Sequence, residues 1–325
     1  MKNLITGGAG FIGSHLAEAL LKQKEEVVVV DDLSTGRMDN INHLRKEKGF
    51  SYHIDTIMNE HLMKRLTQKS DVIFHLAAAV GVKYIIDNPL KSIETNVKGT
   101  EMVFKLADRA GKKKVILAST SEIYGKDRPG KRVFKEEDDR LLGSTSISRW
   151  SYSCTKALDE FLALAYRRER GLPVIIARFF NTCGPRQTGR YGMVVPRFIK
   201  QAIDNRPITV YGDGKQTRCF TDVQDTVKAV ILLSKNPNAI GEAFNIGNPD
   251  NKITINALAK RAKSLAGSKS RIKHVPYEKV YEKGFEDMRH REPDISKLKQ
   301  ITGFVPETDM NHMLSRIVGY LKSRG

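Results

Sequence analysis

Hydrophobic residues along the first half of the chain follow two different periods. Short runs of consecutive apolar, β-branched residues are typical of parallel strands buried on both faces, and Val27 to Val30 is the clearest run. Longer stretches repeat their apolar positions every three or four residues, which predicts helices. Strands are predicted at 2–6, 27–30, 50–54, 71–75, 114–118 and 174–178, and helices directly after Gly13 and at 58–68, 91–110 and 151–170. This alternation predicts a doubly wound α/β fold around a parallel sheet.

The pattern changes after about residue 180. Glycine, proline and arginine become more frequent, and the last third alternates loops with short predicted helices at 253–266 and 294–301. Strands near 208–211 and 243–246 could interleave with the first part of the chain. We therefore expect two lobes with interleaved boundaries, residues 1–180 and 181–325. The second is a smaller mixed α/β lobe that packs over the crevice of the sheet.

A glycine-rich loop joins the first strand to the first helix. Its spacing is Gly7-x-x-Gly10-x-x-Gly13, and the next strand ends in Asp31 and Asp32. Glycines let the backbone approach a pyrophosphate, and a helix N-terminus offers it unpaired N–H groups. A carboxylate at Asp31 can accept hydrogen bonds from ribose hydroxyls and would repel a 2′-phosphate. The context predicts a Rossmann-type dinucleotide site that prefers NAD to NADP.

Tyr152 and Lys156 lie four residues apart in the predicted helix 151–170, for which Ser151 is a candidate N-cap. Both side chains are therefore expected on one helical face. An ammonium beside a phenol stabilises the phenolate and lowers the tyrosine pKa, which favours a base that works near neutral pH. Such pairs also occur by chance, as a partly exposed tyrosine and a solvated lysine.

The carboxyl ends of parallel strands are where ligands bind in α/β sheets. In this chain those ends carry Asp55, His75, the segment 119–122 and Asn181. His75 precedes a run of small residues, which favours a packed or cofactor-adjacent histidine over a catalytic one.

Composition and charge narrow the function classes. The chain has 325 residues, 40% of them hydrophobic, which is typical of globular proteins. The net charge of +18 suggests an anionic partner. Because the basic residues are scattered and no nucleic-acid-binding motif is present, we expect a small anionic substrate and no nucleic acid.

Cysteine usage and hydropathy indicate a compartment. The three cysteines form no close-spaced pair, which argues against disulfides or a structural metal site and suits a reducing cytosol. The chain lacks the layout of a signal peptide and an apolar run long enough for a membrane span. A cytoplasmic protein is expected.

Taken together, these residues resemble the extended short-chain dehydrogenase/reductase family, whose members modify nucleotide sugars with tightly held NAD. The resemblance covers essentially the whole length. Beyond the glycine loop, Asp31 and Asp55, it rests on His75-Leu-Ala-Ala, Asn96-Val-Lys-Gly-Thr100, Ser119-Thr-Ser-Glu-Ile-Tyr-Gly125, Tyr152-x-x-x-Lys156, Asn181-Thr-Cys-Gly-Pro-Arg186, Gly212-Asp-Gly-Lys-Gln-Thr-Arg218 and Arg291-Glu-Pro-Asp294.

The resemblance implies a role for each matching residue. Thr120 and Tyr152 would contact the sugar O4, and Lys156 would hold the nicotinamide ribose. The implied catalytic residues are Thr120, Glu122, Tyr152 and Lys156. The implied NAD-binding residues are Gly7, Gly10, Phe11, Ile12, Gly13, Asp31, Asp32, Asp55, Leu76, Ala77, Asn96, Tyr152 and Lys156. The implied substrate-binding residues are Asn181, Arg186, Arg190, Val195, Tyr211, Arg218, Arg291 and Asp294.

Among the substrate residues, Asn181, Arg218 and Arg291 would reach the diphosphate, and Val195 and Tyr211 would lie near the uracil and its ribose. A guanidinium fork matches phosphate oxygens, which suits the two arginines for this role.

The resemblance implies oxidation at the sugar C4 as the first step and leaves the next step open. Returning the hydride to the other face gives a 4-epimerase, dehydration gives a 4,6-dehydratase, and a C5 carboxylate allows loss of CO2 from a β-keto acid. Glu122 favours the last reaction, because UDP-glucuronate decarboxylases are similar in having Thr-Ser-Glu at this place. The decarboxylase of the bacterial amino-arabinose pathway is also similar at Arg149-Trp-x-Tyr152 and around Arg218 and Arg291.

Other features keep the alternatives open. The matching Arg291 is a proposed proton donor in that decarboxylase but holds diphosphate in epimerases. The loop 188–195 differs from the decarboxylases, so that Arg186 or Arg190 would have to recognise a carboxylate. We expect a UDP-glucuronate decarboxylase, with a UDP-hexose or UDP-hexuronate 4-epimerase as the alternative. A 4,6-dehydratase and a non-catalytic NAD sensor are minor alternatives.

The family usually forms homodimers through the helix near 91–110 and the tyrosine-bearing helix of each subunit. Apolar residues on a second face of these helices, Val103, Phe104, Leu162 and Tyr166, are compatible with such a dimer and equally with a monomer core. A homodimer is expected from the resemblance.

Overall fold

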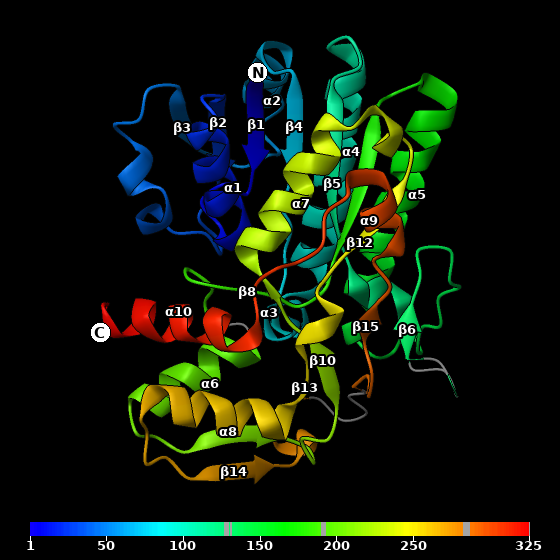
Figure 1. Ribbon diagram of the computed structural model, residues 1–325. Helices are drawn as coiled ribbons and strands as arrows, with labels where there is room; N and C mark the ends of the chain where they lie inside the picture. Colours follow the sequence, from blue (N-terminus) through cyan, green and yellow to red (C-terminus); the bar gives the residue numbers. More distant parts are fainter. Residues whose placement is uncertain (127–129, 131, 190–192, 282–286, 325) are drawn as a thin grey trace.

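The central element of the computed structural model is a sheet of seven parallel strands in the order β12-β7-β5-β4-β1-β2-β3 (Figure 1). The structure describes residues 1–126, 130, 132–189, 193–281 and 287–324. The strands of this sheet are β1 (Lys2–Thr6), β2 (Glu26–Asp31), β3 (Phe50–Ile54), β4 (Val72–His75), β5 (Lys114–Thr120), β7 (Val174–Phe179) and β12 (Ala243–Ile246). The predicted doubly wound α/β fold is confirmed, and the strand at 243–246 does join this sheet, beside β7.

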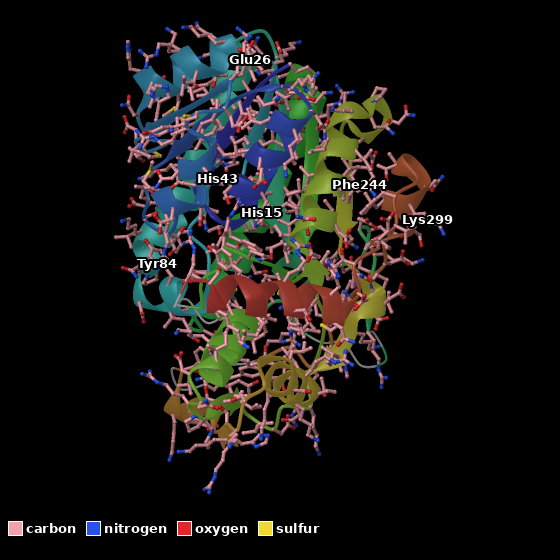
Figure 2. The ribbon with its side chains drawn as sticks, turned by 60° about the vertical axis from the view of Figure 1, so that its left-hand side comes forward. His15, Glu26, His43, Tyr84, Phe244 and Lys299 are labelled. Carbon is pink, nitrogen blue, oxygen red and sulfur yellow. The ribbon has the colours of Figure 1, made fainter. Side chains whose placement is uncertain are left out.

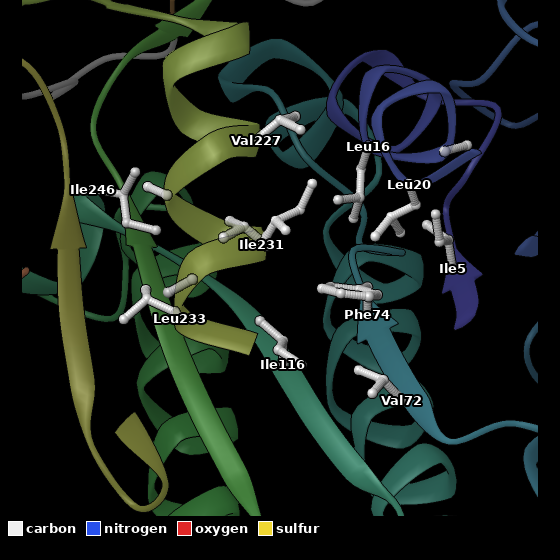
Figure 3. Packing of buried hydrophobic residues seen from close by; sticks show 14 of the residues in the cluster. Ile5, Leu16, Leu20, Val72, Phe74, Ile116, Val227, Ile231, Leu233 and Ile246 are labelled. Atoms are coloured by element: carbon white, nitrogen blue, oxygen red, sulfur yellow. The ribbon is translucent and has the colours of Figure 1, made fainter. Parts of the chain in front are cut away.

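Helices cover both faces of the sheet. One face packs against α1 (Phe11–Lys22), α7 (Val223–Lys235) and α9 (Ser296–Thr302), and the other against α2 (Glu60–Lys69), α4 (Pro89–Arg109) and α5 (Arg149–Arg170). Successive strand residues point to opposite faces of the sheet. Ile5, Phe74 and Ile116 therefore belong to the core on the α1 side (Figure 3), and the preceding residues Leu4, Ile73 and Val115 belong to the core on the α2 side. Both sides of each strand are therefore buried, which explains the uninterrupted apolar runs.

A smaller layer of elements lies beyond the carboxyl ends of the strands (Figure 1). Its own hydrophobic core is formed by α6 (Val194–Ile203), α8 (Ile255–Ala266) and α10 (Met310–Lys322) with the parallel pair β9 (Ile208–Tyr211) and β14 (Ile272–Val275). Short paired strands connect this layer to the sheet: β6 (Val133–Phe134) with β15 (Glu292–Pro293), β8 (Thr182–Cys183) with β11 (Thr221–Asp222), and β10 (Thr217–Cys219) with β13 (Lys252–Thr254). The division at residue 180 stays a prediction.

The predicted strands are all present, while several helix starts differ from the prediction. The tyrosine-bearing helix α5 begins at Arg149, so Ser151 lies inside the first turn and donates its hydroxyl to the Ser148 carbonyl at 2.7 Å. The prediction of Ser151 as N-cap is therefore wrong. At 253–266 the first residues belong to β13 and the helix α8 starts at Ile255.

A buried ion pair fastens α5 to the sheet. The guanidinium of Arg178 on β7 donates from Nε and Nη2 to the carboxylate of Glu160, with the Nη2–Oε2 distance at 2.7 Å. The same guanidinium donates to the hydroxyl of Tyr124 at 2.9 Å. Because α5 carries Tyr152, this pair also helps to fix the position of the candidate base.

We expect Glu160→Ala to lower the free energy of unfolding by about 3–5 kcal/mol, because it leaves the Arg178 charge buried without its carboxylate. Denaturant unfolding followed by the fluorescence of Trp150, the single tryptophan, measures this loss. The matched control is Glu169→Ala on the same helix, which breaks an exposed pair with Arg168 and should cost less than about 1 kcal/mol. Equal stability of the two variants would contradict the assignment.

Candidate active site

A cavity of about 690 Å³ lies where the carboxyl ends of the strands meet the smaller layer. Strand β1 pairs with β2 on one side and with β4 on the other, so the chain order reverses there and the adjacent loops diverge. The lining runs from the glycine loop through Thr120 and Tyr152 to Tyr211 and Arg218 of the smaller layer. One continuous cavity therefore joins the three groups of residues that the sequence singled out.

The glycine loop has the shape of a cradle for a phosphate-bearing cofactor. Gly7 adopts φ +70°, and a Cβ atom on Gly13 would lie 2.3 Å from the Gly7 carbonyl oxygen. Helix α1 starts directly after Gly10 with no side-chain cap and no acidic residue in its first turn. Its first N–H groups thus face the cavity with a favourable dipole for an anion. Gly7, Gly10, Phe11, Ile12 and Gly13 all line the cavity.

The acidic residues predicted for the ribose follow β2 and β3. Asp31 accepts hydrogen bonds from the backbone N–H groups of Ala9 at 2.9 Å and Leu33 at 2.8 Å, and burial raises the pKa of its carboxyl. Asp32 and Asp55 also line the cavity, and Asp55 is held by the side-chain amide of Asn59 at 2.8 Å. These residues and the glycine cradle fit a dinucleotide.

The segment after β4 contributes Leu76 and Ala77 to the cavity wall. Asn96, predicted to bind the cofactor, lies behind this wall, where its side chain accepts from the Ala79 N–H at 2.7 Å. It positions the segment and is not among the lining residues. His75 bonds the hydroxyls of Thr6 and Thr100, and burial lowers its pKa to about 3, which confirms it as a packed histidine.

Thr120, Glu122 and Tyr152 come together at the middle of the cavity. Thr120 is the last residue of β5. Its side chain accepts a hydrogen bond from the Glu122 N–H at 3.2 Å, at the start of the short 3₁₀ helix η3 (Ser121–Tyr124). Ser153 on α5 donates to the Glu122 carbonyl at 2.7 Å and so joins the turn to the tyrosine-bearing helix. The three side chains thus have fixed positions in the same part of the wall.

Lys156 is placed differently from the prediction. Its ammonium is buried and bonds the carboxylate of Asp159 at 2.7 Å, and it is not among the described residues that line the cavity. Burial raises the pKa of the Tyr152 hydroxyl, as do the charges of Glu122 and Asp159, while a hydrogen bond with Thr120 acts in the opposite direction. The prediction that Lys156 lowers the pKa of Tyr152 is therefore wrong for this structure.

Glu122 lies between two arginines. Arg291 Nη1 bonds Oε1, and Arg149 Nη2 lies 3.4 Å from Oε2. Burial alone would raise the pKa of Glu122, but Arg291, Arg149 and Arg218 hold it well below its usual range. The cavity therefore contains an ionised carboxylate directly beside Thr120 and Tyr152.

Five of the predicted substrate residues line the cavity: Asn181, Val195, Tyr211, Arg218 and Arg291. Asn181 accepts from Arg291 Nη2 at 3.2 Å and donates to the Cys219 carbonyl at 3.0 Å. Arg218 donates from Nη2 to the carboxylate of Asp287 at 2.9 Å.

Two other predicted substrate residues are placed elsewhere. Arg186 turns to the outer side of α1, where it donates to Glu18 at 2.7 Å near His43; His15 and His43 mark that side in Figure 2. Asp294 accepts a hydrogen bond at 2.8 Å from the N–H of Ser296, the first residue of α9. Neither residue lines the cavity, because the Arg186 guanidinium bonds Glu18 and the Asp294 carboxylate bonds the Ser296 N–H instead. Arg190 lies outside the described residues.

The structure adds lining residues that the sequence reasoning did not assign: Arg149, Arg197, Gln216, Tyr277, Tyr281 and Asp287. The Arg197 guanidinium lies 3.8 Å from the centre of the Tyr211 ring, and the Tyr281 ring meets the same tyrosine edge-on. Two of them carried a sequence signal: Arg149 lies three residues before Tyr152, and Gln216 lies inside the quoted stretch Gly212 to Arg218. The other four lie outside the quoted motifs.

The match to known families agrees with this geometry. The model of the GDP-mannose 4,6 dehydratase family matches residues 4–317, nearly the whole chain. The chain belongs to this family. The resemblance to extended short-chain dehydrogenases/reductases that act on nucleotide sugars is thereby confirmed.

Members of this family with different reactions are similar to the chain. UDP-N-acetyl-alpha-D-glucosaminuronate decarboxylase of Bacillus cytotoxicus is 45% identical over 98% of this chain and 97% of its own length. UDP-glucuronic acid decarboxylase 1 of Arabidopsis thaliana is 36% identical over 100% of this chain and 70% of its own. The structure of UDP-glucuronic acid 4-epimerase from Bacillus cereus, in complex with UDP-glucuronic acid and NAD, has a TM-score of 0.87 at 29% identity, with both chains covered fully.

The described residues contain no group of three or more His, Cys, Asp or Glu side chains arranged to hold a metal ion. Within the same ranges, no helix is both long and apolar enough to cross a membrane.

We expect Gly13→Ala to weaken NAD binding by about tenfold or more, because the new methyl group would overlap the Gly7 carbonyl oxygen and force the cradle open. Titration of the protein with NADH, followed by nicotinamide fluorescence, measures the change. Gly319→Ala is the control, since no atom lies within 4 Å of its added Cβ. Unchanged NADH affinity of Gly13→Ala would remove the glycine loop from the cofactor site.

Proposed function

We propose that this protein is an NAD-dependent decarboxylase of a UDP-linked hexuronate. The observation that carries the proposal is Glu122, a partly buried carboxylate held by two arginines beside Thr120 and Tyr152. The 45% identity to a UDP-N-acetyl-alpha-D-glucosaminuronate decarboxylase and the 36% identity to a UDP-glucuronic acid decarboxylase support it.

The proposed ligand contacts follow the cavity from end to end. The cradle of Gly7, Gly10 and Gly13 and the carboxylates of Asp31 and Asp55 would hold the cofactor. Arg218 and Arg291 would bind the diphosphate, because guanidinium groups pair with phosphate oxygens. Tyr211, with the neighbouring aromatic rings, would receive the uracil.

A bound oxidised nicotinamide would supply an acceptor for the C4 hydride and a positive charge that favours the ionised form of Tyr152. Tyr152 takes the O4 proton as the C4 hydride leaves, and Thr120 orients the hydroxyl. The resulting β-keto acid loses CO2 from C5, and its electrons pass to the C4 carbonyl. C5 then takes up one proton from solvent, which Glu122, ionised at rest beside Thr120 and Tyr152, would first accept and then pass to C5. The C4 ketone either takes the hydride back, which gives the UDP-pentose and restores the oxidised cofactor, or leaves as the 4-keto product.

Glu122 separates this reaction from epimerisation. A 4-epimerase needs only removal and return of hydride at C4, for which Tyr152 and Thr120 suffice. Decarboxylation also needs delivery of a proton to C5, for which Glu122 is the ionisable group beside Thr120 and Tyr152. A UDP-hexuronate 4-epimerase is the second candidate, favoured by the full-length similarity to the Bacillus cereus enzyme.

We expect release of ¹³CO2 from UDP-glucuronate or UDP-N-acetylglucosaminuronate labelled at C6, and a pentose product by NMR. Glu122→Gln should lower CO2 release by about 100-fold or more, since general acid–base groups contribute that much, while NAD binding is retained. Comparison of the two substrates identifies the substituent at C2. A product that retains the C6 carboxylate with inverted C4 would establish the epimerase instead.

We also propose a homodimer, formed through exposed apolar residues of the adjacent helices α4 and α5. Phe161 is 61% exposed and lies near Leu158 and Leu164, and Leu90 on α4 is 70% exposed. Of the two interpretations that the sequence left open for the residues named there, the core interpretation holds, because Val103 and Phe104 are fully buried and Leu162 and Tyr166 pack against the same core. We therefore place the dimer contact on the exposed apolar residues instead.

We expect Phe161→Glu to convert the dimer to a monomer, because a charge at the centre of the apolar face opposes burial. Sedimentation velocity at several concentrations measures the state. Val305→Glu is the control, since Val305 is a similarly exposed apolar residue outside α4 and α5. A wild-type monomer at all concentrations would contradict the dimer.

We further propose a cytoplasmic location. Cys154, Cys183 and Cys219 are free thiols, which suits a reducing compartment.

A further inference from the structure

The two oxygens of Glu122 are held by different arginines from different parts of the chain. Arg291, which directly precedes β15, bonds Oε1, and Arg149 at the start of α5 contacts Oε2 at 3.4 Å. Both guanidinium groups are almost fully buried. Either arginine alone could neutralise the carboxylate, so the presence of two needs an explanation.

The second partners of the two arginines differ. Arg149 Nη1 donates to Asp287 at 3.2 Å, and its guanidinium lies 5.3 Å from the ring of Trp150. Asp287 is itself fixed by Arg218 at 2.9 Å and by the Tyr277 hydroxyl at 3.0 Å. Arg149 is thereby anchored by a carboxylate outside Glu122.

Arg291 has a single carboxylate partner among the described residues. Apart from Glu122 it bonds the neutral amide oxygen of Asn181 at 3.2 Å. It therefore lacks the second anionic anchor that Asp287 gives to Arg149.

The cluster holds an excess of positive charge. Three guanidinium groups, of Arg149, Arg218 and Arg291, share the two carboxylates of Glu122 and Asp287. A diphosphate has two negative charges and attracts the guanidinium groups that can reach it. All three arginines line the cavity, but Arg149 has two carboxylate partners, whereas Arg218 and Arg291 have one each among the described residues. A diphosphate therefore competes more readily for Arg218 and Arg291.

We propose that Arg149 is a positioning residue, which keeps Glu122 ionised and in place once a bound diphosphate has drawn Arg291 and Arg218 away from the carboxylates. The proposal rests on the proposed function, because it assigns the diphosphate of a nucleotide sugar to this part of the cavity. It assigns Arg149 and Asp287 the role of positioning Glu122, which is a different role from binding the diphosphate.

Electrostatics give the direction of the effect. The groups that face Glu122 are Arg149 and Tyr152 from α5, Arg218 from β10, and Arg291 from the segment before β15, with Asp287 beyond Arg149. Burial continues to oppose the charged form when Arg291 leaves, so the pKa of Glu122 rises on diphosphate binding. Arg149 limits this rise, and Asp287 weakens Arg149 because it shares the same guanidinium.

The test uses UDP, which carries the diphosphate but cannot react. The pKa of Glu122 is measured by NMR on protein with ¹³C-labelled glutamate carboxyls, and Glu122→Gln identifies the signal. UDP should raise this pKa in the wild type. With UDP bound, Arg149→Gln should raise it further by about 1–3 pH units, and Asp287→Asn should lower it. Arg149→Lys keeps the charge and should restore most of the wild-type value.

The opposite directions of the two variants distinguish this role from a structural one, because general loosening of the site would shift both the same way. If thermal unfolding shows that Arg149→Gln does not fold, the pKa measurement on Asp287→Asn still tests the proposal. With substrate, the part of the pH profile of CO2 release that depends on ionisation of Glu122 should shift to higher pH in Arg149→Gln. NAD affinity should not change.

A Glu122 pKa that does not respond to UDP, or that is the same in Arg149→Gln and Asp287→Asn, overturns the proposal. The proposed function fails by a different observation, which is absence of CO2 from either hexuronate with wild-type protein. The NMR titration needs no turnover, so the two failures are separable.

Discussion

The pairing of β1 with β2 on one side and β4 on the other determines where the rest of the site can lie. This central position directs the loops after β1 and β4 away from each other and opens the crevice between them. The glycine loop has to turn within this crevice, and the contact of Gly13 with the Gly7 carbonyl leaves no space for a side chain. Helix α1 then starts at the crevice and points its N-terminus into it.

The position of the smaller layer follows from this arrangement. Segments near residues 181, 195, 211, 218 and 291 reach the cavity because short strand pairs join them to the carboxyl edge of the sheet. Strand β12 returns into the sheet after α7, so the two layers cannot separate without breaking the parallel pairing with β7. The substrate side of the cavity is thus attached rigidly to the cofactor side.

The ionic cluster around Glu122 links the two ends of the cavity. It runs from Glu122 beside Tyr152, through Arg149 and Asp287, to Tyr277 beside the aromatic rings. Buried charges of this kind persist only when each has a partner, which makes their arrangement sensitive to any anion that enters. Under the proposed function, a bound diphosphate would therefore also act on the carboxylate beside Tyr152.

The sequence by itself determined the strands, the parallel sheet and the glycine cradle, because each depends on local periodicity or on residues close in the chain. The grouping of Thr120, Glu122 and Tyr152 came from the resemblance to the family, since Tyr152 lies about thirty residues from the other two. Only the tertiary structure decided that Lys156 pairs with Asp159, that Arg186 and Asp294 turn away from the cavity, and that Asp287 enters it. A charged side chain takes the nearest opposite charge, and that neighbour often comes from a distant segment. The first turns of α5, Arg149 to Lys156, show both cases: Asp159, the partner of Lys156, lies one turn further along the same helix, while Asp287, a partner of Arg149, comes from a distant segment.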